Sequence, residues 1–141
     1  MNKNIFLLLL ICPCLLDAQI IRGKLFFQRP YASAEQRMIK RAPSATYIAS
    51  GTKVVLIPLD RMAPATVAAA RSSNVFQCYN LNNFPQAVST ITNSDGYYYF
   101  RSMPAGNYVL RVCGSSAQYA VQVTNNDRPY KLMPDLAVSS N

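Results

Sequence analysis

The chain has 141 residues, of which 14 are Lys or Arg, 6 are Asp or Glu and none is His, so its formal net charge is +8. The absence of His excludes Ser-His-Asp and Cys-His catalysis and the zinc sites that use imidazole ligands. Because the basic residues are scattered along the chain, nucleic acid is a poor candidate partner, whereas acidic glycans or acidic protein surfaces suit the charge.

The first 18 residues have the pattern of an export signal. Lys3 provides a positive start, the apolar run Ile5–Leu16 follows, and a cleavage site lies between Ala18 and Gln19. The apolar run is shorter than the about 20 residues that a membrane helix needs. We therefore expect a signal peptide over 1–18 and one mature domain over 19–141, which is secreted, periplasmic or held at the cell envelope, with no integral membrane span.

The mature chain is expected to open with a strand over Ile20–Phe27, because its apolar residues alternate. Gly23 inside this strand indicates a bulge or a close approach of another group to the backbone. Residues 29–50 then form a long basic insert, which is either a binding loop or an ordinary solvated loop. The candidate binding residues of the insert are Arg37, Lys40 and Arg41.

The next segment, Thr52–Leu59, is predicted to be a strand with apolar side chains on both faces. Such a strand needs a cover on its second face, and the Ala-rich segment Ala63–Ser73, a short helix or an ordered crossover, is expected to lie over Val55 and Ile57. The alternation in Asn74–Tyr79 predicts a further strand.

Residues Thr90–Cys113 are predicted to form three short strands in an antiparallel meander. The turns are Asn93–Gly96, which has a Gly that tolerates positive φ, and Met103–Gly106, in which a Pro presets φ. Between them, Tyr98 and Phe100 fall on the face that we expect to be buried.

The side chains that alternate away from this buried face form a candidate binding surface. Its predicted members are Tyr97, Tyr99, Arg101 and Arg111. Tyr rings bury area at low entropic cost, and Arg adds bidentate hydrogen bonds or cation–π contacts, so such a surface suits sugar rings or a partner protein. The alternative is cross-strand pairing that only stabilises the sheet.

The C-terminal part contributes a strand over Ala117–Val123 and a last one over Tyr130–Val138, which is interrupted at Pro134. With about seven short strands separated by turns and little helix, the chain is expected to be an all-β, seven-stranded antiparallel Greek-key sandwich with a long insert between its first two strands.

Three stretches resemble carboxypeptidase regulatory-like domains. Ile21–Leu25 is similar to the opening strand of that family and Gly51–Leu56 to its second strand. The core motif is matched by Thr92, Gly96, Tyr98, Phe100, Pro104, Gly106, Tyr108, Leu110 and Val112. The resemblance implies a small transthyretin-like sandwich of the kind common in secreted and cell-surface bacterial proteins, and an accessory module without the peptidase chemistry. The insert is much longer than the corresponding link in the family.

The acidic residues of the mature chain give no catalytic or metal-binding pattern. They are Glu35, Asp60, Asp95, Asp127 and Asp135, and they are too far apart in sequence for a calcium site. We therefore expect no catalytic residue, no metal and no cofactor. After export, Cys78 and Cys113 form either a disulfide or two separate thiols, and the sequence leaves both open.

These observations favour an exported, non-catalytic module that gives binding or structural support at the cell envelope. Its expected partners are an envelope protein or an anionic or neutral glycan. The alternatives are a small-ligand carrier of the transthyretin type and a hydrolase of unrecognised type.

Overall fold

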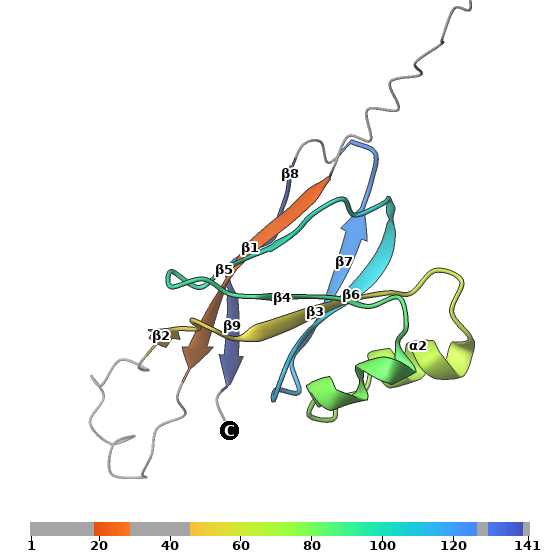
Figure 1. Ribbon diagram of the computed structural model, residues 1–141, viewed down its shortest axis with the longest axis horizontal. Coiled ribbons are helices and arrows are strands. Elements are labelled where there is room, and N and C mark those ends of the chain that lie inside the picture. The colour runs from red at the N-terminus through yellow and green to blue at the C-terminus, as the bar shows by residue number, and fades with distance from the viewer. Residues whose placement is uncertain (1–18, 29–45, 127–129, 140–141) are drawn as a thin grey trace, which may run out of the picture.

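The computed structural model describes residues 19–28, 46–126 and 130–139. The expected signal peptide and the basic residues Arg37, Lys40 and Arg41 lie outside the described residues. The described chain forms two β-sheets packed face to face, with two short helical segments beside one of the sheets (Figure 1). The prediction of an all-β sandwich is confirmed.

The first sheet has five strands arranged around the long strand β1 (Ile20–Gln28). Its partners are β2 (Thr46–Ile48) and β5 (Tyr97–Phe100), both antiparallel to β1, and β8 (Tyr130–Leu132) and β9 (Leu136–Ser139), both parallel to it. The sandwich is therefore mixed and not wholly antiparallel as expected. The two C-terminal strands follow one another along β1 with a break around Pro134, as the sequence predicts.

The second sheet has four antiparallel strands. Their order is β4 (Val88–Ile91), β3 (Lys53–Pro58), β6 (Gly106–Val112) and β7 (Gln118–Val123). Consequently β3 and β6, which carry the longest apolar runs, occupy the centre of this sheet.

The strands of Thr90–Cys113 do not form the predicted meander, because they alternate between the two sheets. β4 and β6 pair with β3, whereas β5 pairs with β1. The two predicted turns exist but act as crossovers between the sheets. In the first, the Asn93 carboxamide oxygen accepts from the backbone N–H groups of Asp95 and Tyr97, and Gly96 has the expected positive φ of 79°.

The main core lies between the sheets. Tyr98 and Phe100 from β5 are buried there, opposite Tyr108, Leu110 and Val112 from β6. The period-two pattern therefore identified the inward face of both strands correctly.

A second core lies on the outer side of the four-stranded sheet. Val55, Ile57 and Val109 from the sheet pack against residues of α2 (Pro64–Ala70) and of the loop that follows it. The predicted cover over β3 is thus confirmed, and Figure 1 shows α2 and the helical turn after it at this side of β3 and β6.

The strand predicted over Asn74–Tyr79 is wrong. Residues 74–77 have no regular secondary structure, and the 3-10 helix η1 (Cys78–Asn83) follows them. Phe76 is buried in the second core, and its backbone bonds to the turn after β6, where its N–H donates to the Ser115 carbonyl and its carbonyl accepts from the Gly114 N–H. One buried ring in an irregular loop produced the alternation that resembles a strand.

Cys78 and Cys113 form a disulfide, with their Cα atoms 5.5 Å apart. Of the two possibilities left open by the sequence, the bridge is therefore the one present. It ties the start of η1 to the residue that follows β6, where strand alternation no longer fixes the direction of the side chain.

The end of the predicted insert is not a loop. Residues 46–48 form β2 and extend the edge of the first sheet, where the Ala49 N–H also bonds to the Leu25 carbonyl at 3.1 Å.

Candidate functional site

The predicted binding surface is divided between the two sheets. Tyr97 and Tyr99 lie on β5 in the first sheet, and Arg101 is exposed just beyond it. Arg111 lies on β6 in the second sheet, and its side chain is only 1% exposed. The prediction that Arg111 faces solvent beside the tyrosines is wrong, because the link between β5 and β6 crosses from one sheet to the other.

The residues that do join the tyrosines come from β1. Arg22 is opposite Tyr99 in the strand register, and Lys24 is opposite Tyr97. The Arg22 guanidinium carbon lies 4.7 Å from the Tyr97 ring centroid and 5.8 Å from that of Tyr99. The Lys24 ammonium lies 5.1 Å from the Tyr97 centroid and 5.0 Å from that of Phe26. These five residues form a cation–aromatic ladder along the outer face of the sheet.

Uncharged and apolar side chains surround the ladder. Ile48, Tyr130 and Leu132 are 49%, 54% and 69% exposed. Their register partners on β1 are Phe26, Ile20 and Arg22, so all three share the outer face. Within the described part of the chain, no carboxylate pairs with Arg22 or Lys24. Exposed apolar side chains that gather on one face are typical of an interaction surface.

The sequence contains a signal for this arrangement. Arg22 and Lys24 alternate with the buried residues of β1, which places them on the outer face. What the sequence does not contain is the pairing of β1 with β5, since the two strands are separated by about half of the chain.

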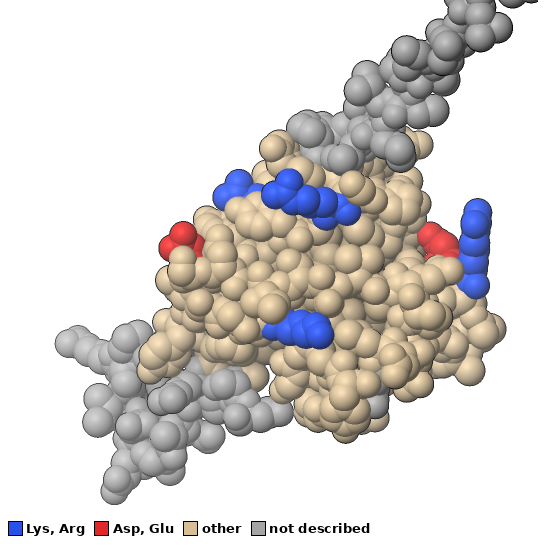
Figure 2. Space-filling view, viewed as in Figure 1, with Lys and Arg blue, Asp and Glu red and all other residues tan. Residues whose placement is uncertain are grey.

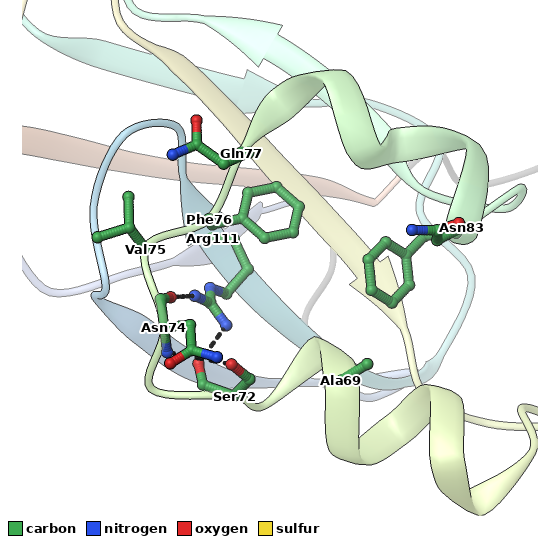
Figure 3. Close-up of a pocket in the computed structure, with 9 residues that line it drawn as sticks. Ala69, Ser72, Asn74, Val75, Phe76, Gln77, Asn83 and Arg111 are labelled. Atoms are coloured by element: carbon green, nitrogen blue, oxygen red, sulfur yellow. Dashed lines mark hydrogen bonds between the residues drawn. The ribbon is translucent and has the colours of Figure 1, made fainter.

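Arg111 has a different environment, which Figure 3 shows. Its Nη1 donates to the carbonyl oxygens of Ala70 at 2.8 Å and Ser72 at 2.7 Å. Its Nη2 donates to the Asn74 carbonyl at 2.8 Å. The guanidinium carbon also lies 5.0 Å from the centroid of the Phe76 ring. Arg111 therefore fixes the irregular chain between α2 and η1 to the centre of the sheet.

A pocket of about 300 Å³ opens beside this guanidinium. Its lining residues include Asn74, Gln77 and Asn83, which carry amides, and the aromatic residues Phe76 and Phe84. Burial lowers the pKa of Arg111 from its ordinary value. A guanidinium nevertheless keeps its charge in proteins, so a positive charge lies beside the pocket.

Among the described acidic side chains, Asp60 has a structural contact. Both oxygens of Asp60 accept hydrogen bonds from Asn107, from the backbone N–H at 2.8 Å and from the carboxamide at 3.1 Å. The backbone bond is the main reason that the pKa of Asp60 is lowered. Asp60 thus holds the start of β6.

Two further features bear on function. Within residues 19–28, 46–126 and 130–139, no group of three or more His, Cys, Asp and Glu side chains is placed to hold a metal ion. In the same part of the chain, no helix has the length and hydropathy for a membrane span.

On the face drawn in Figure 2, basic side chains gather at one place near the top and are otherwise isolated, and the acidic ones lie at the two sides.

No protein-family model matches the chain, and no curated protein sequence is significantly similar to it. Among solved structures, the major plantain pollen allergen is similar over 87% of this chain and 94% of its own, with 10% identity and a TM-score of 0.53. This similarity supports the β-sandwich fold.

Two bacterial structures are less similar. A Pseudomonas aeruginosa protein proposed to bind carbohydrate has 16% identity and a TM-score of 0.48, over 87% of this chain and 88% of its own. The minor pilin of Streptococcus agalactiae has 16% identity and a TM-score of 0.46, over 86% of this chain and 49% of its own. The resemblance to carboxypeptidase regulatory-like domains stays a prediction.

Proposed function

We propose that the protein is an exported, non-catalytic β-sandwich of the carboxypeptidase regulatory-like kind, which binds acidic glycan at the cell envelope through the cation–aromatic ladder. The observation that carries this proposal is the placement of Arg22 and Lys24 over the rings of Phe26, Tyr97 and Tyr99, with no carboxylate partner among the described residues.

The ladder suits such a ligand for two reasons. Contact with the rings holds both cations in defined positions, so little side-chain entropy is lost when they bind an anion. An Arg guanidinium also binds carboxylate or sulfate through two parallel hydrogen bonds. Beside the cations, the exposed ring of Tyr99 offers an apolar surface for the C–H face of a sugar.

Export is supported by two features. The pattern of residues 1–18 predicts a signal peptide, and the disulfide between Cys78 and Cys113 is of the kind that persists in oxidising compartments.

The test compares retention of the folded protein on immobilised polygalacturonate and on neutral dextran. We expect retention on the acidic polymer only, falling as salt is added, because screening weakens exposed charges. Replacing Arg22 and Lys24 by Gln should weaken binding by about tenfold or more, since two charge-assisted contacts are lost. Tyr99→Ala should weaken it further.

A matched control separates the ladder from net charge. Arg61→Gln with Arg71→Gln removes the same charge from exposed positions on the other side of the sandwich. If this variant loses as much binding as the ladder variant, the ladder is not the site. Retention on neither polymer would refute glycan binding, and capture of an acidic envelope protein through Arg22 and Lys24 would move the proposal to a protein partner.

A further inference from the structure

We infer that the pocket beside Arg111 is a second binding site, for a single acidic monosaccharide unit whose carboxylate meets the guanidinium. The pocket lies on the outer side of the four-stranded sheet, whereas the ladder lies on the outer side of the five-stranded sheet. The inference therefore does not depend on the ladder.

Arg111 carries a charge that no other described group compensates. The side chain is almost wholly buried, its three hydrogen bonds all go to neutral carbonyl oxygens, and its Nε has no hydrogen-bond partner. Within the described residues, no carboxylate pairs with it. Buried charges in proteins are usually matched by a counter-charge, because burial of an unmatched one is costly. An anion in the adjoining pocket would supply that counter-charge.

The chain around the pocket is held at several points. Arg111 anchors the backbone at Ser72 and Asn74, and the Phe76 N–H bonds to the Ser115 carbonyl at 2.9 Å. On the far side, the disulfide ties Cys78 to the chain two residues after Arg111. An irregular segment held at several points is preorganised, which reduces the entropy lost when a ligand binds.

The residues that line the pocket combine polar and apolar groups. Three carboxamides, those of Asn74, Gln77 and Asn83, provide donors and acceptors for hydroxyl groups. The rings of Phe76 and Phe84, with centroids 6.1 Å apart, form an apolar wall. The volume of about 300 Å³ is at the small end for ligand pockets and suits one sugar ring. A uronate combines hydroxyl groups, an apolar C–H face and one carboxylate, so it matches all three parts.

The experiment follows the side-chain amide signals of Asn74, Gln77 and Asn83 by NMR in the disulfide-bonded protein. Galacturonate is the probe, and its methyl ester and galactose are the matched ligands without the charge. We expect saturable shifts at these amides with a millimolar Kd for galacturonate and binding about tenfold weaker for both neutral ligands, because the charge-assisted contact is lost. Equal affinity for the acid and its ester would overturn the inference.

Exposed variants test the lining without disturbing Arg111. Gln77→Ala with Asn83→Ala should weaken galacturonate binding by about tenfold, since two hydrogen-bonding groups are removed. The control, Gln118→Ala with Gln122→Ala, removes two exposed amides from β7 and should leave binding unchanged. Equal loss in both variants would refute the site, as would the absence of any saturable shift. Shifts confined to Arg22 and Tyr97 would refute it while supporting binding at the ladder.

Discussion

The ring of Tyr98 lies directly against the backbone of Gly23, its partner in the register between β1 and β5. A Cβ atom added at Gly23 would lie 2.8 Å from the Cε1 atom of Tyr98 and closer still to the end of the ring. The glycine is therefore required by the space that the aromatic side chain occupies. The sequence predicted a bulge or a close approach at this position, and the structure shows the close approach.

Gly23→Ala should destabilise the protein by about 1–3 kcal/mol, as overpacking of a buried site does. Urea unfolding measures the change. The cost should fall when Tyr98→Leu is present, because the side chain that meets the new methyl group is then shorter. Strictly additive costs in this double-mutant cycle would show that Tyr98 is not the reason for the glycine.

Tyr98→Phe should leave stability unchanged or raise it by about 1 kcal/mol, since the Tyr98 hydroxyl is buried without a hydrogen-bond partner. Burial also raises the pKa of Tyr98. The contribution of this pKa difference to the stability of the folded protein is fully present below the unfolded pKa of about 10. It is lost as the pH rises above that value. The variant should therefore lose less stability than the wild-type protein in alkaline urea titrations. A large loss at neutral pH would reveal a hydroxyl partner.

Asp60→Asn should change how stability depends on acidic pH. Hydrogen bonds from Asn107, the backbone bond first, lower the pKa of Asp60 in the folded protein. Its contribution is therefore present above the unfolded pKa of about 3.9 and is lost as the pH falls through the lower folded value. Urea unfolding at a series of pH values should give a shallower acid slope for the variant. An unchanged slope would mean that other carboxylates account for the acid sensitivity.

The sequence predicts the inward faces well because burial imposes a period of two on each strand. Val55 and Ile57 even reveal that β3 is covered on its second side. The sequence does not show which sheet each strand joins, so its alternation predicts Tyr99 and Arg111 on one surface although a crossover separates them. The structure shows that Arg111 pairs with Val55 across β3 and β6, so it shares the face that the helix covers.

Replacing Cys78 and Cys113 by Ala should lower stability by about 3–4 kcal/mol in the chain-entropy model, because the bridge closes a loop across a sequence separation of 35. The loss should appear as a lower urea midpoint, and reduction of the wild-type protein should reproduce it. Amide exchange at Phe76 should also speed up, since the bridge restrains the neighbouring end of this loop. Equal midpoints for oxidised and reduced protein would contradict the prediction.

Arg111→Lys should destabilise the protein by about 1–3 kcal/mol, although it keeps the charge. The guanidinium reaches the carbonyl oxygens of Ala70, Ser72 and Asn74 from two nitrogens, and a single ammonium group cannot serve all three with that geometry. At least one carbonyl then loses its donor, so amide exchange in residues 71–76 should rise more than in β1. Arg101→Lys, at an exposed position, should stay within about 0.5 kcal/mol of wild type in the same urea assay. A lysine variant as stable as wild type, with unchanged exchange in residues 71–76, would show that the charge alone holds this loop.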